Sequence, residues 1–66
     1  MKITLYSTSN IESIELEKAL RGKSLKYEKV ADIETMQNKG FMSAPMLEVD
    51  GEVMNYINGR KWISEI

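Results

Sequence analysis

The sequence has no cysteine and no histidine among its 66 residues, and it has only one proline and one tryptophan. Without cysteine and histidine, the chain has no thiol chemistry, no Cys/His zinc site, no Ser–His triad and no imidazole acid–base catalysis. Long apolar runs are also missing, which excludes a transmembrane helix or the core of a signal peptide. We therefore expect no metal, no cofactor and no membrane partner.

The charged residues balance each other closely. The chain has nine Lys and Arg and ten Asp and Glu, which gives a net charge of −1. This balance does not favour binding to nucleic acid. The chain is long enough for one small domain, and its apolar content of 42% must form a core without a disulfide. We expect a single cytoplasmic domain spanning residues 1–66.

The first half of the chain predicts two strand–helix pairs, with strands at residues 2–6 and 25–30 and helices at residues 11–21 and 33–39. Ser9 and Asn10 compete as the N-cap of the first helix, and Gly22 is expected to end it. In this helix Leu16, Ala19 and Leu20 form the core stripe.

Two isoleucines of the first helix, Ile11 and Ile14, lie outside its core stripe. Either a loop covers them or they form an exposed apolar patch. In the second helix, Ile33 and Met36 are expected to face inward. The acidic residues of the first helix are interpreted as a solvated face that suits its N-terminal half: Glu12, Glu15 and Glu17.

The second half predicts a hairpin followed by a helix. Asp50-Gly51 is a strong hairpin signal between strands at residues 46–49 and 52–54. Asn58-Gly59 predicts a break, and residues 60–66 a last helix whose apolar face carries Trp62, Ile63 and Ile66. The order β-α-β-α-β-β-α gives an α/β fold with a four-stranded mixed sheet and helices on both faces.

This order resembles the minimal thioredoxin fold of the glutaredoxins across essentially the whole chain. The resemblance is carried by Lys-Ile-Thr-Leu-Tyr-Ser at 2–7, Leu-Lys-Tyr-Glu-Lys-Val at 25–30, Gly-Phe-Met-Ser-Ala-Pro at 40–45 and Val-Asp-Gly at 49–51. It implies that Pro45 is cis and faces the position of the redox motif. The family's activity would be thiol–disulfide exchange.

The Cys-x-x-Cys motif of that family is absent. Counting from the first strand places its two positions at Ile11 and Ile14, whereas counting back from the second strand places them at Asn10 and Ser13. A serine hydroxyl cannot exchange disulfides. Under both alignments the sequence predicts a protein that is not an enzyme.

The predicted function is therefore that of a redox-inactive module that binds a protein or an extended peptide at the former active-site surface. The resemblance and the apolar side chains together assign this surface to Thr8, Ile11, Ile14, Met42, Ala44, Pro45, Asn55 and Tyr56. Pairing of a peptide with the backbone of Ala44 is implied by the resemblance.

Two alternatives remain open at this point. The chain could derive from a glutaredoxin-type electron carrier, for example toward ribonucleotide reductase, whose cysteines were replaced. It could also be a non-catalytic glutathione-binding domain, but glutathione is not expected because the charged residues that would pair with its carboxylates are missing.

Overall fold

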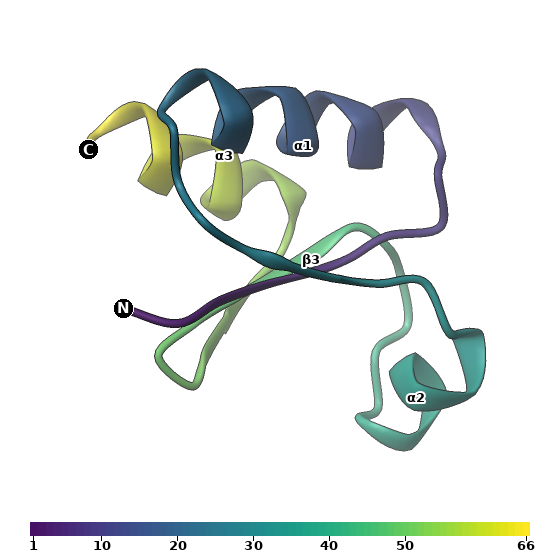
Figure 1. Ribbon diagram of the computed structural model, residues 1–66. Helices are drawn as coiled ribbons and strands as arrows, with labels where there is room; N and C mark the ends of the chain where they lie inside the picture. Colours follow the sequence, from purple (N-terminus) through teal and green to yellow (C-terminus); the bar gives the residue numbers. More distant parts are fainter.

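The computed structural model describes all residues from 1 to 66 as a small α/β domain (Figure 1). Its elements are β1 (Ile3–Tyr6), α1 (Ile11–Gly22), β2 (Glu28–Val30), α2 (Ile33–Asn38), β3 (Met46–Val49), β4 (Glu52–Met54) and α3 (Tyr56–Ser64). The four strands form one sheet in the order β2-β1-β3-β4. The β1–β2 pair is parallel and the other pairs are antiparallel, so the predicted mixed sheet with three helices is confirmed.

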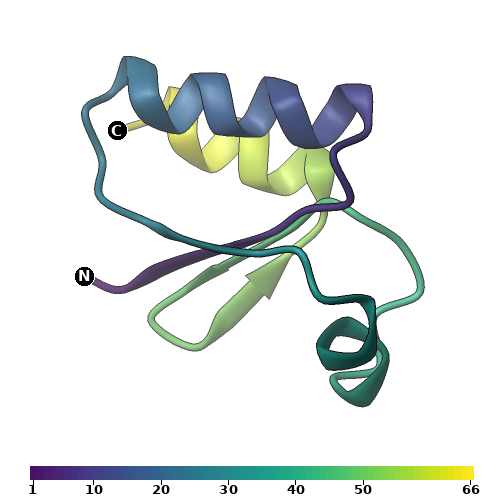
Figure 2. The same ribbon diagram turned by 45° about the vertical axis from the view of Figure 1, so that its right-hand side comes forward.

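The helices are distributed unevenly around the sheet. In both views α1 and α3 lie side by side over one face, whereas α2 lies apart on the other side, beyond one end of the sheet (Figures 1 and 2). There Met36 is buried, and the ring of Tyr6 packs edge-on against Phe41 at 4.9 Å. The second face is thus covered by helix only at its end.

The core lies between the sheet and the α1–α3 pair. Alternation along the paired strands β1 and β3 places their apolar residues on the face beneath these helices. The buried cluster consists of Ile3, Leu5, Leu16, Leu20, Leu47, Val49 and Ile63. None of the three helices is long and apolar enough to cross a membrane.

The hairpin between β3 and β4 forms as predicted. Asp50 and Gly51 both have positive φ, at 50° and 89°. This conformation suits a tight hairpin turn and is accessible to aspartate and glycine. Asp50 also holds β1, because its carboxylate accepts from the backbone N–H of Lys2 at 2.8 Å.

The end of α1 differs from the prediction, which placed the stop at Gly22 and a strand from residue 25. The helix includes Gly22, and the left-handed residue is Ser24, with φ of 56°. The N–H of Leu25 reaches back to the carbonyl of Leu20 at 3.1 Å, as in a Schellman cap. Leu25 therefore closes the helix, and β2 begins only at Glu28.

The prediction for the last helix was wrong at its start. Asn58 and Gly59 do not break the chain but lie inside α3, whose N-cap is Asn55. The Asn55 side chain accepts from the N–H of Asn58 at 2.9 Å, which fixes the first turn. Consequently Ile63 is buried, Trp62 is half-buried and Ile66 is exposed beyond the helix.

In α2 one of the two inward-facing residues was assigned wrongly. Met36 is buried, but Ile33 is 61% exposed. The helix has six residues and touches the rest of the protein with one side only, so its first residue remains at the surface.

Candidate functional site

The peptide bond between Ala44 and Pro45 is cis, which confirms the prediction for the only proline of the chain. The ring of Pro45 is fully buried, just before the start of β3. Of the residues before it, Met42 and Ser43 are exposed and Ala44 is half-buried.

Asn10 joins the start of α1 to this segment. Its side-chain oxygen caps the helix by accepting from the N–H of Ser13 at 2.8 Å. Its side-chain Nδ2 donates to the carbonyl of Ala44 at 3.2 Å. Asn10, and not Ser9, is therefore the N-cap, and the same side chain fixes the distance between helix and proline.

The backbone before Pro45 has three N–H groups without a hydrogen-bond partner. The N–H groups of Met42, Ser43 and Ala44 donate no hydrogen bond to the rest of the chain, either to backbone or to side chains. Free N–H groups at the surface can donate to the backbone of another chain. These three N–H groups can donate to a bound peptide without breaking a bond of the protein, whereas the carbonyl of Ala44 is already bonded to Asn10.

One cavity, of about 220 Å³, opens on the α2 side of this segment; we call it the apolar cavity. No charged residue lines it. Its lining consists of Thr8, Ile33, Met36, Gln37, Phe41, Met42, Ser43 and Ala44. The Met42 side chain is 100% exposed at its rim.

A second cavity, of about 210 Å³, opens on the α3 side; we call it the acidic cavity. It shares Ser43 and Ala44 with the apolar cavity, so the two flank the same stretch of backbone. Its lining consists of Glu12, Ser43, Ala44, Pro45, Asn55, Tyr56 and Ile57, of which only Glu12 is charged.

Tyr56 lines the acidic cavity and is held in place by Glu15 of α1 and Arg60 of α3. Its phenol donates to Glu15 of α1 and accepts from the guanidinium of Arg60 at 3.0 Å. The hydrogen bond to Glu15 raises the pKa of Tyr56 above its ordinary value of 10.0. The phenol is therefore neutral at physiological pH, and the Arg60–Glu15 ion pair, at 3.8 Å, leaves little net charge beside it.

Most of the residues predicted for the site come together at these cavities. Thr8 and Met42 line the apolar cavity, and the acidic cavity is lined by Pro45, Asn55 and Tyr56, with Ala44 common to both. Ile11 and Ile14 line neither cavity. They are 77% and 45% exposed on the first turns of α1, so no loop covers them.

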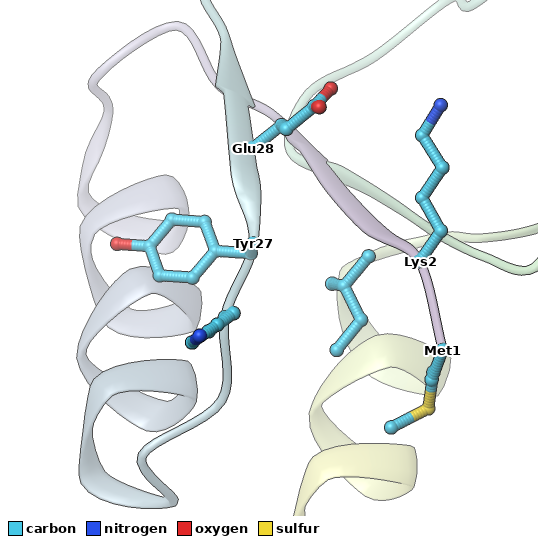
Figure 3. Close-up of a pocket in the computed structure, with 6 residues that line it drawn as sticks. Met1, Lys2, Tyr27 and Glu28 are labelled. Atoms are coloured by element: carbon cyan, nitrogen blue, oxygen red, sulfur yellow. The ribbon is translucent and has the colours of Figure 1, made fainter.

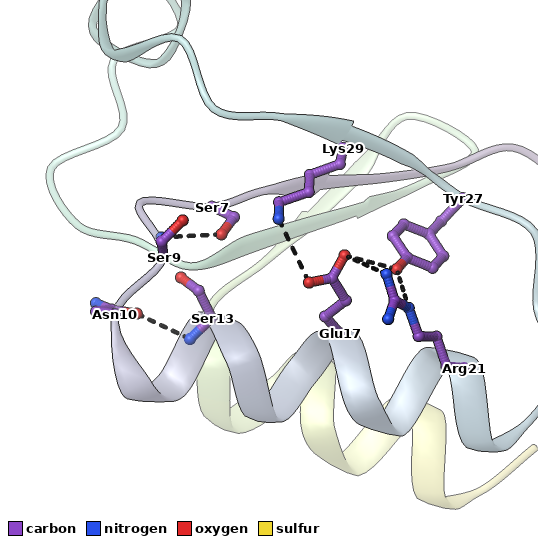
Figure 4. A network of polar contacts seen from close by, with 8 residues as sticks. All are labelled: Ser7, Ser9, Asn10, Ser13, Glu17, Arg21, Tyr27 and Lys29. Carbon is purple, nitrogen blue, oxygen red and sulfur yellow. Dashed lines mark hydrogen bonds and ion pairs between the residues drawn. The ribbon is translucent and has the colours of Figure 1, made fainter.

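The two alternative positions that the resemblance gives for a redox motif have different surroundings. Ile11 and Ile14 point to solvent, whereas Ser13 is only 1% exposed. Figure 4 shows the Ser13 hydroxyl directed from α1 toward Ser7 and Ser9, and this hydroxyl has no hydrogen-bond partner. A buried hydroxyl without a partner costs stability, which sets Ser13 apart from an ordinary helix serine.

Sequence reasoning missed several lining residues, chiefly Phe41, Ser43, Ile57 and Glu12. The first three neighbour predicted residues along the chain, so adjacency was an available signal. Glu12 was interpreted as part of a solvated face, because helix periodicity does not indicate that the segment before Pro45 lies beside it.

A third cavity, of about 210 Å³, lies around the start of β1 and the residues leading into β2 (Figure 3). It is lined by Met1, Lys2, Ile3, Lys26, Tyr27 and Glu28, with charges of both signs and no residue of the predicted site.

Across the 66 residues, no grouping of three or more acidic side chains is arranged to hold a metal ion. Comparisons of the chain with protein-family models, curated protein sequences and solved structures found no match. The site must therefore be interpreted from its own geometry.

Proposed function

We propose that this protein is a glutaredoxin-like domain of the thioredoxin fold that has no redox activity and binds an extended segment of another protein beside Pro45. The observation that carries the proposal is the row of three free N–H groups at Met42, Ser43 and Ala44, flanked on both sides by cavities. Backbone pairing would supply affinity, and the cavities would select side chains.

The position of Asn10 supports the family relationship. The resemblance implies that the redox motif faces the cis proline, and Asn10, the N-cap of α1, bonds to Ala44 through its side chain. We therefore favour Asn10 and Ser13 as the former motif positions over Ile11 and Ile14. Neither pair provides a thiol, so binding is proposed without exchange chemistry.

The remaining parts of the proposal rest on the sequence. A cytoplasmic location fits a small domain without the disulfides on which secreted domains of this size commonly depend. Ile11 and Ile14 are proposed to contact the partner outside the cavities, because they are exposed on the helix that borders the acidic cavity.

The test is a selection of binding peptides from a random hexapeptide library, followed by titration of a selected peptide into the ¹⁵N-labelled protein. We expect amide shifts at Thr8, residues 42–44 and residues 55–57. The variant Met42→Asp/Ile57→Asp places a charge at the rim of each cavity. Because both side chains are exposed, it should keep the fold and weaken binding about tenfold, the effect of losing roughly 1.4 kcal/mol.

The matched control is Ile66→Asp, which introduces the same charge at an exposed apolar residue outside both cavities. It should bind the peptide as the unmodified protein does. Equal binding by Met42→Asp/Ile57→Asp and the unmodified protein, or shifts confined to the cavity around residues 1–3 and 26–28, would contradict the proposal.

A further inference from the structure

We infer that the segment bound beside Pro45 carries a Lys or Arg side chain close to an apolar side chain. This inference rests on the proposed function and specifies the partner of the same site. Its basis is the unequal chemistry of the two cavities that flank Ser43 and Ala44.

The apolar cavity selects the apolar side chain. Its wall includes Phe41, Met36 and the largely exposed Ile33, and the rim is formed by the fully exposed Met42. A leucine-sized side chain seated there would remove apolar surface from water on both partners. The flexible thioether of Met42 can adapt to its shape.

The acidic cavity selects the cation. Glu12 is exposed, and its carboxylate takes part in no ion pair and no side-chain hydrogen bond. It is the only charged residue lining either cavity. An acidic side chain of a ligand would therefore meet a carboxylate that no cationic side chain neutralises, whereas a Lys or Arg side chain would supply the missing partner.

The cations elsewhere around the site do not reverse this preference. Arg60 is engaged with Glu15 and with the phenol of Tyr56. On the other side, Lys39 pairs with Glu48 at 3.5 Å and lies over the ring of Tyr6. Each of these cations already has a carboxylate partner, and Glu12 has none.

The test compares library selections on three forms of the protein. With the unmodified protein, the selected hexapeptides should be enriched in Lys or Arg together with a large apolar residue. With Glu12→Lys the basic residues should be replaced by Asp or Glu while the apolar residue stays. With Glu52→Lys, the same change at an exposed residue outside both cavities, the preference should match that of the unmodified protein.

A single selected basic peptide then gives the size of the effect. Glu12→Gln should weaken its binding about twofold to fivefold, as expected for one exposed ion pair. The loss should shrink as salt is raised, because salt screens exposed charges. Glu12→Gln keeps the length of the side chain, so the apolar contact is unaffected.

The outcomes separate this inference from the proposed function. Peptides that shift residues 42–44 but show no charge preference, or the same preference on Glu12→Lys, would overturn the inference and leave the binding function standing. Failure to select any peptide that shifts these residues would overturn both.

Discussion

At the scale of single residues, Asn10 connects local and tertiary structure with one side chain. Its oxygen satisfies a free N–H of the first turn of α1, and its nitrogen satisfies the carbonyl of Ala44. The helix cap is a local interaction that many sequences provide with Ser, Thr or Asp. The second bond needs a side-chain donor, which Asp lacks.

Substitutions at Asn10 should separate these two roles. Asn10→Ala removes both bonds and should lower the free energy of unfolding by about 1–2 kcal/mol. Asn10→Ser keeps a capping oxygen, but its side chain is too short to reach the carbonyl of Ala44. The loss in the free energy of unfolding should therefore be about half of that in Asn10→Ala. Urea unfolding measures both, and ¹⁵N amide shifts at Ala44 should move in both variants. A Ser variant as unstable as the Ala variant would contradict this division.

Glu17 is the second residue with an unusual role, because it connects α1 to β2 and to Tyr27, the residue just before β2. Its carboxylate accepts from the phenol of Tyr27 at 2.7 Å and pairs with Lys29 and Arg21, each at 3.4 Å (Figure 4). The side chain is only 16% exposed. The Tyr27 hydrogen bond, with help from the two cations, holds the pKa of Glu17 below its ordinary value of 4.5.

This lowered pKa gives a pH-dependent stability with a definite sign. The folded protein keeps Glu17 ionised to lower pH than the unfolded chain, so the stabilisation is complete above pH 4.5 and disappears as pH falls through the folded-state pKa. Glu17→Gln should therefore lower the free energy of unfolding by about 1–2 kcal/mol near neutral pH and by much less in strong acid. Urea unfolding of Glu17→Gln and of the unmodified protein, from neutral pH into acid, measures this difference in the free energy of unfolding.

The control for Glu17→Gln is Glu52→Gln, since Glu52 is exposed and forms no ion pair. It should leave both the stability near neutral pH and its pH dependence almost unchanged. A difference between Glu17→Gln and the unmodified protein that stayed constant from neutral pH into acid would show that packing, and not charge, is responsible.

At the scale of elements, the packing of α3 on the sheet depends on Gly59. A side-chain carbon added there would lie 3.3 Å from the Cβ of Leu47 on β3, which is tighter than usual contact. The absence of a side chain thus lets α3 approach the centre of the sheet and bury Ile63. This explains why a glycine is found inside a helix, where it otherwise costs about 1 kcal/mol relative to alanine.

Gly59→Val should overpack this contact and lower the free energy of unfolding by about 2–3 kcal/mol. Gly22→Val is the matched control, because nothing lies within 4 Å of a side-chain carbon added at Gly22 near the end of α1. The control should change stability by less than about 1 kcal/mol. Thermal unfolding of the two variants compares them, and equal losses would contradict a close approach at Gly59.

At the scale of the whole molecule, the candidate site forms where three distant parts of the chain meet. The start of α1, the segment before β3 and the start of α3 contribute Asn10, Ala44 and Asn55. The pairing of β1 with β3 and the packing of α1 beside α3 bring these parts to one end of the domain (Figure 2). The far end carries the cavity around residues 1–3 and 26–28, which shares none of them.

Introducing two thiols tests the proposed relationship of this site to a redox motif. Asn10→Cys/Ser13→Cys should form a disulfide on oxidation, and its outer thiol should have a pKa below the ordinary value of about 8.5, because it lies at the N-terminus of α1. Ile11→Cys/Ile14→Cys is the matched comparison. It shares the helix N-terminus, but both side chains are exposed and line neither cavity, so its disulfide should lack contact with the Pro45 segment and exchange more slowly. The pH dependence of alkylation and the rate of exchange with a small disulfide measure both. Greater activity of the second pair would refute the Asn10/Ser13 alignment.

The order of elements, the Asp50–Gly51 hairpin and the core residues of α1 could be predicted from the sequence, because these depend on periodicity and on turn residues close together in the chain. The start of α3 at Tyr56 depends on the tertiary structure, because the close packing of the helix against Leu47 favours a glycine at position 59 inside the helix. The tertiary structure also decided that Ile33 is exposed, because a helix that packs with one side at the end of the sheet leaves its first residue in water.

The same division holds for the candidate site. The resemblance located Ala44 and Pro45, and the apolar side chain located Tyr56, but the sequence could not place Glu12 beside them. Glu12 comes to the acidic cavity because the Asn10 bond to Ala44 fixes where α1 begins relative to the proline segment. Contacts between residues more than thirty positions apart depend on how the sheet and the helices pack. A local sequence pattern therefore does not predict which of these residues come together.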